Sequence, residues 1–348
     1  MGVALTMGAV AVVTSLILGE GLKDPEGALG PSWIRIPLMV LGAFVIDVLP
    51  RSLWRSRRRI RGFPFHARTI IAEHWTRERI QLVVIGLVSF YVTYVSYRNL
   101  KNFLPQVTGE VTHDRFLHQI DKWLMFGHEP AIVLHSLLGQ TYSAHVLATV
   151  YLLFLPISPL SLTVYLVWSR NISYGYWYAT AGCLAWALGT VSYYALPTLG
   201  PAFWYVWLYA DLDPTGVTTL QNSLFYSRLD VLYDPVTTDS IQSVAGFASL
   251  HVGIILTLAL VTHYTVRHAW IRRSMWVFFA LTVVSTLYFG WHYIADDIAG
   301  AVIAIVSVWL GGLATGQKFD KHGRSSHPTT STSDVPVEGR ESVPAGTT

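Results

Sequence analysis

Long apolar stretches separated by polar loops dominate the pattern of this chain. We place eight such stretches, each close to the 17 to 25 residues that cross a bilayer as a helix. They cover roughly residues 3–19, 34–50, 80–97, 144–168, 176–196, 247–266, 274–290 and 294–315. Because a lipid-exposed backbone has to satisfy its own hydrogen bonds, we expect all eight to be helices. The pattern predicts an all-α integral membrane protein with about eight transmembrane helices.

The composition agrees with a membrane setting. Of the 348 residues, 52% are hydrophobic and only 13% are charged, whereas soluble proteins are about 25% charged. The single cysteine, Cys183, excludes a disulfide framework and a cysteine-rich metal site. The first stretch has no positively charged n-region and no small-residue cleavage site, so we interpret it as a retained span.

The distribution of basic residues predicts the orientation. Lys and Arg total 24, and 17 of them fall on one set of loops, with nine arginines in 51–79 alone. Since basic loops stay in the cytoplasm, we expect both termini inside and 101–143 and 197–246 outside. The arginine run at 55–61 adjoins a span, so we interpret it as a topology anchor on anionic headgroups rather than as a nucleic-acid site.

These assignments divide the chain into four parts. They are an N-terminal two-helix hairpin (1–50), a basic cytoplasmic segment (51–79), a six-helix catalytic membrane domain (80–316) and a disordered cytoplasmic tail (317–348) rich in Ser, Thr, Pro and Gly. Within 101–143, apolar residues recur at helical spacing, namely Phe116, Leu117, Ile120, Trp123 and Leu124. We expect that segment to form a helix in the membrane interface that roofs the bundle.

A few ionisable residues at the outer ends of the spans are the candidate chemistry. His251 begins the sixth span, and His292 and Asp296 lie where the seventh span, broken at Gly290, turns into the eighth. Intramembrane ionisable groups are costly and by default functional. His292 and Asp296 are four residues apart, so the carboxylate can orient the imidazole and leave its other nitrogen free as a nucleophile or base. Asp297, rotated by about 100° on a helix, is expected to be structural.

Two features favour an anion at this rim. The first turn of the eighth helix offers free backbone N–H groups and a helix dipole. Arg228 is the only basic side chain between Pro197 and Phe247, and arginine binds phosphate oxygens bidentately. Two other functions remain open on these residues alone, a zinc or iron site and a proton or ion relay in a transporter.

At these residues the sequence resembles the phosphatidic acid phosphatase type 2 superfamily. It is most similar to the branch of the fungal inositol phosphorylceramide synthases and their actinobacterial relatives. The second family motif, Pro-Ser-Leu-His in this branch, resembles Ala248-Ser249-Leu250-His251. The third, Ser-Arg-x5-His-x3-Asp, resembles Ser285, Thr286, His292 and Asp296. The first motif, Lys-x6-Arg-Pro, is absent as such, and Thr286 replaces a phosphate-binding arginine.

The resemblance implies a six-helix core and a lipid phosphotransferase or phosphatase that needs no metal or other cofactor. It implies His292 as the nucleophile that forms a phosphohistidine, Asp296 as its partner and His251 as the general acid and base. Ser249 and Arg228 would bind the substrate phosphate. The donor would be a lipid phosphate or phosphodiester, with an alcohol such as inositol as a possible acceptor.

The resemblance also implies a location and an alternative. The active site would lie on the extracytoplasmic face of a bacterial plasma membrane, with no nucleic-acid partner. A polyprenyl-phosphate or phosphatidate phosphatase is the alternative, because water in place of an alcohol turns the same chemistry into hydrolysis.

Overall fold

Helices account for most of the chain that the structure describes. The structure is a computed structural model that describes residues 1–25, 32–56, 63–109, 111–169, 171–318 and 329–330. The helices are α1 (Gly2–Leu18), α2 (Ser32–Arg55), α3 (Phe63–His74), α4 (Arg77–Thr108), α5 (Asp114–Leu124), α6 (Pro130–Leu138), α7 (Tyr142–Leu152), α8 (Phe154–Thr163), η3 (Val164–Trp168), α9 (Ile172–Ala195), α10 (Pro201–Trp204), η4 (Val206–Tyr209), α11 (Gly216–Tyr233), α12 (Leu250–Thr265), α13 (Ala269–Tyr288) and α14 (Ile294–Ala314).

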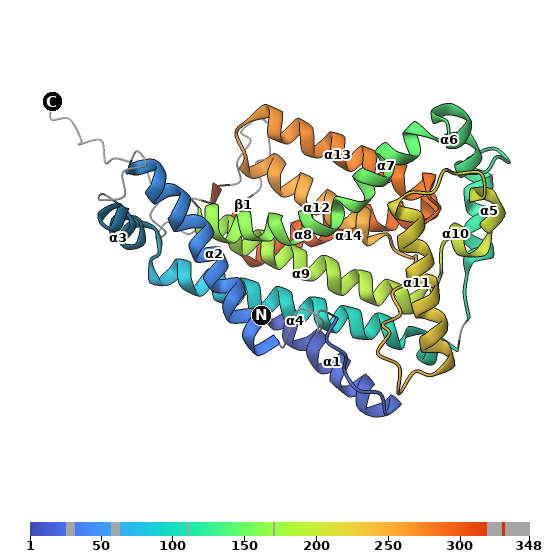
Figure 1. The fold of residues 1–348 in the computed structure, drawn as a ribbon, viewed down its shortest axis with the longest axis horizontal. Helices are drawn as coiled ribbons and strands as arrows, with labels where there is room; N and C mark the ends of the chain where they lie inside the picture. Colours follow the sequence, from blue (N-terminus) through green and yellow to red (C-terminus); the bar gives the residue numbers. More distant parts are fainter. Residues whose placement is uncertain (26–31, 57–62, 110, 170, 319–328, 331–348) are drawn as a thin grey trace.

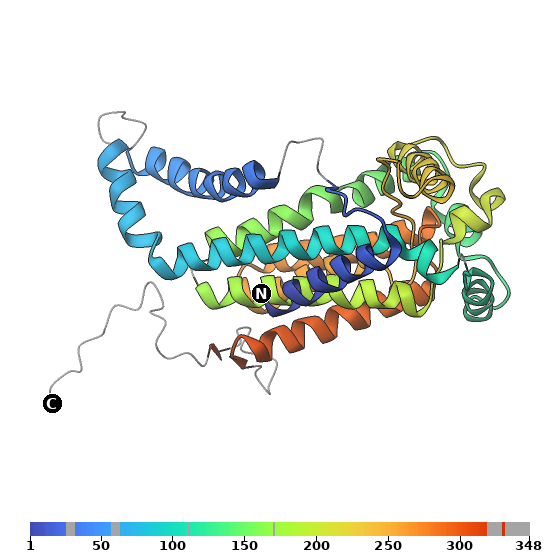
Figure 2. The same cartoon turned by 90° about the horizontal axis from the view of Figure 1, so that it is seen from below.

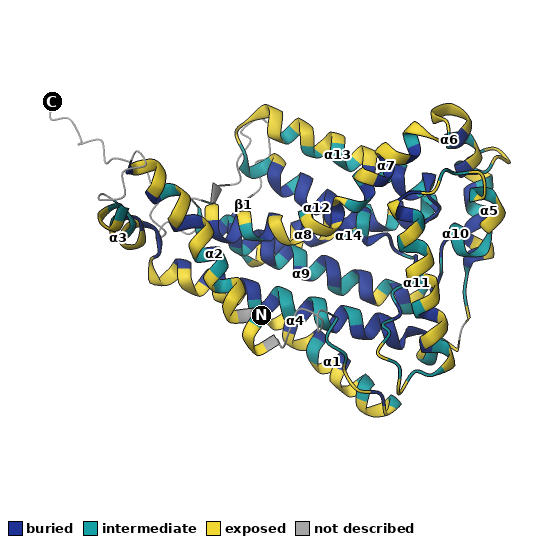
Figure 3. Cartoon of the chain, viewed as in Figure 1, coloured by how far each residue is buried: buried dark blue, intermediate teal, exposed yellow. Residues whose placement is uncertain are grey.

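The long helices form a bundle built around α9. This helix packs against α4, α12 and α14, while α13 packs on α12 and α1 on α4 (Figure 1). The buried residues of the bundle are mainly apolar or small, and its outward faces are exposed along most of their length (Figure 3). Since those exposed faces carry large apolar side chains, they suit contact with lipid rather than water.

Each of the eight predicted spans contains a helix. Among the described residues, four helical segments are long and apolar enough to cross a membrane, namely Trp33–Arg55, Arg77–Thr108, Tyr142–Trp168 and Ile294–Ala314. The apolar helices α1 and α12 are shorter. Several apolar helices support an integral membrane protein, while the count of eight crossings and the six-helix core stay predictions.

The ends of the chain are described only in part. Gln317–Lys318 pairs with Thr329–Thr330 as a two-residue antiparallel ladder, β1 with β2. The rest of the predicted disordered tail, and residues 57–62 of the predicted arginine anchor, lie outside the described residues.

Helix α4 continues well past residue 97, where its apolar run was predicted to end. It reaches Thr108, and Gly109 caps it in the left-handed conformation (φ 63°). The extension carries polar side chains that are buried instead of exposed, namely Asn99, Lys101 and Asn102. The helix therefore brings polar groups into one end of the bundle.

The predicted outer segments gather at one end of the bundle (Figures 1 and 2). There α5, α10 and α11 lie together, with α11 running across the ends of the long helices. The predicted helix within 101–143 is present as α5, with Phe116 59% and Trp123 80% exposed. Its opposite, polar face is buried through Asp114, His118 and Asp121. An exposed apolar stripe on such a helix is what contact with the acyl boundary requires.

Helices α12 and α14 approach each other closely at a pair of glycines. A Cβ atom on Gly300 would overlap the Ser249 carbonyl oxygen and lie 3.1 Å from its carbon. A Cβ atom on Gly253 would lie 3.1 Å from the Gly300 carbonyl oxygen. Because glycine leaves the backbones room to meet, the first turns of the two helices can share one site.

Candidate active site

The two candidate histidines meet at the end of the bundle where the predicted outer segments gather. His251 lies in the first turn of α12, and His292 lies in the turn between α13 and α14. Their ring centroids are 6.0 Å apart. As predicted, the chain breaks at Gly290, which has a φ of 67°, and this reversal places His292 opposite His251.

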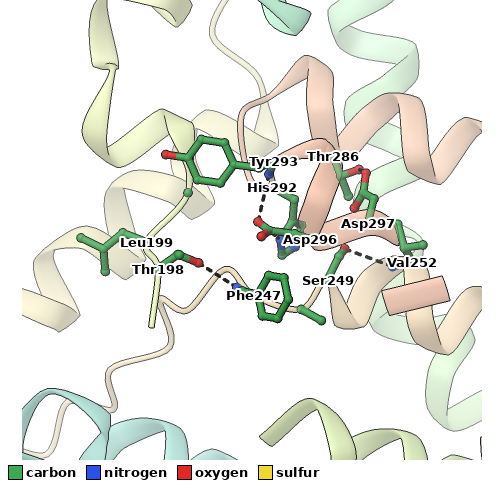
Figure 4. A network of polar contacts seen from close by, with 12 residues as sticks. Thr198, Leu199, Phe247, Ser249, Val252, Thr286, His292, Tyr293, Asp296 and Asp297 are labelled. Carbon is green, nitrogen blue, oxygen red and sulfur yellow. Dashed lines mark hydrogen bonds and ion pairs between the residues drawn. The ribbon is translucent and has the colours of Figure 1, made fainter. Parts of the chain in front are cut away.

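Asp296 is next to His292, as their spacing predicts. Its Oδ2 lies 3.4 Å from Nδ1 of His292 and accepts the Tyr293 N–H at 2.9 Å (Figure 4). The first distance is longer than an ordinary N–H···O bond, and catalytic contacts are often long without substrate. The Asp296 carbonyl also accepts the Ser249 N–H at 2.9 Å, which ties the first turns of α12 and α14 together.

Asp297 contacts residues of the candidate site, although its position on the helix predicted a purely structural role. Its Oδ2 accepts the Thr286 hydroxyl at 2.8 Å, and the Ser249 hydroxyl also hydrogen-bonds to it. Its charge acts on the His292 imidazole as well. Thr286, which stands where the family has a phosphate-binding arginine, therefore anchors Asp297 to α13 (Figure 4).

The protonation state of His292 suits a nucleophile. The side chain is 5% exposed. Burial lowers the pKa of His292 to about 4, against the opposing effect of the Asp297 carboxylate, and the charge of Lys101 lowers it further. The imidazole is thus neutral at pH 7, with a lone pair available for attack. Since Nδ1 faces Asp296, Nε2 is the nitrogen left for a substrate.

A cavity of about 170 Å³ opens beside the two imidazoles. His251 and His292 line it together with aromatic residues, including Tyr151 and Trp291. Tyr151 stacks on His251 at a centroid distance of 4.4 Å and on Trp291 at 5.2 Å. Such rings fix the orientation of the His251 imidazole and make part of the cavity wall aromatic.

Arg228 and Ser249 are the two residues predicted to bind the substrate phosphate. Arg228 is buried on α11, and Ser249 caps α12 with its hydroxyl 3.4 Å from the Val252 nitrogen. Neither is among the described residues that line the cavity. The structure thus brings together His251, His292 and Asp296, and the roles predicted for Arg228 and Ser249 stay predictions.

The first turn of α14 is not free to bind an anion, contrary to the expectation from the sequence. Asp296 accepts the Tyr293 N–H, and Asp121 of α5 accepts the Ile294 N–H at 3.0 Å. These carboxylates satisfy the helix end, as acidic caps commonly do.

Helix α5 braces the site through two carboxylates that the sequence did not single out. Asp114 accepts the backbone N–H groups of Leu199 (3.1 Å) and Gly200 (2.9 Å) and the Tyr293 hydroxyl (3.1 Å). Burial raises the pKa of Asp121 to about 7. The seven-residue spacing of the two aspartates, which puts both on one helical face, was the signal available in the sequence.

The described residues also bear on the metal alternative. Across them, His, Cys, Asp and Glu side chains form no group of three or more that could hold a metal ion. The candidate site is therefore a pair of imidazoles with carboxylates behind one of them, which is a constellation for nucleophilic and acid–base chemistry.

Comparison with known proteins identifies the sequence family. Residues 115–310, more than half of the chain, match the PAP2 superfamily, a superfamily of phosphatases and phosphotransferases. No curated protein and no solved structure matches the chain. The matched range includes both histidines and Asp296, and it begins after α4 has ended.

Proposed function

The chain belongs to the PAP2 superfamily, and we propose that it is a membrane enzyme that transfers or hydrolyses a lipid phosphate through a phosphohistidine on His292. The observation that carries the proposal is the facing pair of imidazoles, 6.0 Å apart at one cavity, with Asp296 behind His292. A phosphoryl group between two such rings can be attacked from one side while its ester oxygen is protonated from the other.

The first step forms the phosphoenzyme. Nε2 of His292 attacks phosphorus, and the bond from phosphorus to the ester oxygen breaks. Protonated His251 gives its proton to that oxygen, so the first product leaves as an alcohol. Asp296 stabilises the positive charge that develops on the His292 ring, which is the role of a carboxylate behind a catalytic imidazole.

The second step regenerates the enzyme. Neutral His251 removes the proton from an acceptor hydroxyl, the acceptor oxygen attacks phosphorus, and the bond from phosphorus to Nε2 breaks. His251 is then protonated again and ready for the next donor. In both steps the bonds made and broken and the proton transfers involve only His251, His292, the donor and the acceptor.

The identity of the acceptor determines whether the enzyme is a transferase or a phosphatase. With an alcohol such as inositol, the product is a new phosphodiester, and we place the protein with the inositol phosphorylceramide synthase-like branch on its Ala248-Ser249-Leu250-His251 motif. With water, the same site is a polyprenyl-phosphate or phosphatidate phosphatase. The basic loops favour a site on the extracytoplasmic leaflet.

A panel of donors and acceptors tests the proposal. Purified protein in detergent is incubated with phosphatidylinositol, phosphatidate or a polyprenyl phosphate, with and without inositol, in the presence of a chelator, and products are identified by mass. We expect turnover that disappears in His292→Ala and persists in His263→Ala. That control changes a histidine at the other end of α12, bonded to Trp276. Turnover that requires an added metal, or that persists in His292→Ala, contradicts the mechanism.

A further inference from the structure

Two basic residues of α4 line the same cavity as the two histidines. Arg98 and Lys101 are three residues apart, hence on one face of the helix, and both contribute to the cavity wall. Lys101 is 8% exposed and donates to the Tyr97 hydroxyl at 3.2 Å. Its ammonium also lies 4.9 Å from the centre of the Tyr193 ring. These aromatic contacts hold the charge at the cavity without neutralising it.

No acidic partner offsets these two charges. Within the described chain, neither Arg98 nor Lys101 forms an ion pair, and Nε of Arg98 has no hydrogen-bond partner. The described lining of the cavity contains no Asp or Glu. A buried cation without a counter-ion is costly to the fold, and an anion that enters the cavity would stabilise its charged form.

The cavity is also close to the reacting atoms. The charge of Lys101 acts on the imidazoles of both His251 and His292. Other groups expected to attract phosphate already have partners, because Thr286 bonds to Asp297 and the first amides of α14 are capped by carboxylates. Arg228 is not among the lining residues.

We propose that Lys101 and Arg98 form the substrate phosphate-binding site, with Lys101 holding the non-bridging oxygens beside His292 and Arg98 farther along the same face of α4. This inference rests on the proposed function for the identity of the reacting group. It goes beyond the family match, because both residues precede position 115, where that match begins. The apolar and aromatic wall of the cavity accommodates the start of an alkyl chain, so the ligand class is an alkyl or lipid phosphate.

Binding of dodecylphosphonate tests this site without turnover, because its carbon–phosphorus bond is not a substrate for hydrolysis. Affinity for the whole chain in detergent is measured by calorimetry at pH 6, where both the ammonium of Lys101 and the phosphonate are charged, with dodecanol as the uncharged comparison. We expect the wild type to bind the phosphonate and not the alcohol. Lys101→Met and Arg98→Gln should each weaken binding about 10- to 100-fold, the worth of one hydrogen bond to a charged group. The control Lys122→Met removes an exposed ammonium on α5 and should change affinity less than twofold.

Thermal unfolding separates binding from a structural role. Because Lys101→Met removes an uncompensated buried charge, its melting temperature without ligand should equal or exceed that of the wild type. Lys101→Arg, which keeps the charge, should retain part of the affinity. Normal binding by Lys101→Met overturns the proposal. So does a wild type that does not bind the phosphonate, or a loss of binding matched by an equal loss of thermal stability.

The outcomes also separate this inference from the proposed function. If Lys101→Met loses phosphonate binding but no donor is ever turned over, the binding site stands and the phosphotransferase mechanism fails. If His292→Ala abolishes turnover while Lys101→Met binds and turns over normally, the mechanism stands and the binding site is wrong.

Discussion

Adding one methyl group at Gly300 should inactivate the enzyme by moving its two histidines apart. A Cβ atom there would overlap the Ser249 carbonyl oxygen, lie 3.1 Å from its carbon and lie 3.3 Å from the Gly253 nitrogen. Non-bonded carbon atoms prefer about 3.5–4.0 Å. Because the obstacle is backbone, α12 and α14 must separate by about 1 Å to restore ordinary contact distances, and His251 moves with α12.

The two effects of that shift differ in size. Overpacking costs about 1–3 kcal/mol of stability, which a folded membrane bundle can tolerate. A displacement of about 1 Å between reacting groups costs about 100-fold in rate. Turnover of the best donor from the panel and thermal unfolding are measured for Gly300→Ala and for the control Gly182→Ala, whose new methyl group meets no atom within 4 Å. Gly300→Ala with turnover within threefold of the wild type and unchanged thermal stability would refute the packing argument.

Three further expectations concern charge and topology. Asp296→Asn should lower turnover by about 10² to 10⁴, as for other carboxylates behind a catalytic imidazole, measured on the best donor. Because the pKa of Asp121 is raised in the folded state, the folded protein binds the Asp121 proton more tightly than the unfolded chain does. The contribution of Asp121 to the free energy of unfolding is therefore present below about pH 4 and is lost as the pH rises to about 7. Melting temperatures across that range should therefore fall less steeply in Asp121→Asn. In a Cys183→Ala background, an impermeant thiol reagent should label Phe126→Cys in intact cells and Trp270→Cys only after lysis, and the reverse would overturn the predicted orientation.

The helices and the break at Gly290 could be predicted because both have local causes. Apolar runs of bilayer length make helices wherever they fall in the chain, and a residue with positive φ is most easily glycine. The four-residue spacing of His292 and Asp296 is equally local. That these two lie opposite His251 followed from alternating the direction of the spans.

The phosphate-binding cations and the brace on α5 could not be predicted in the same way. Lys101 follows the end of an apolar run, and a polar residue there is ordinarily solvated. Lys101 is buried because α4 packs against α9 and against the loop before α12. In that loop, the Gln242 side chain donates to the Lys101 carbonyl at 3.0 Å. The burial of Asp114 could not be predicted either, because the backbone N–H groups that it accepts, those of Leu199 and Gly200, lie 85 and 86 positions away in the sequence. Long-range contacts leave no signal in local spacing.

The central claim is a covalent bond between phosphorus and His292, and a rapid-quench experiment tests it most directly. Protein is mixed with a donor labelled on phosphorus, quenched within one turnover, digested, and analysed by mass spectrometry for a phosphorylated peptide. We expect an alkali-stable, acid-labile phosphoryl group on His292 that decays with time through hydrolysis, or faster when inositol is added as acceptor, and that is absent in His292→Ala. A turnover-competent enzyme with no labelled peptide, or with the label on another residue, would contradict it.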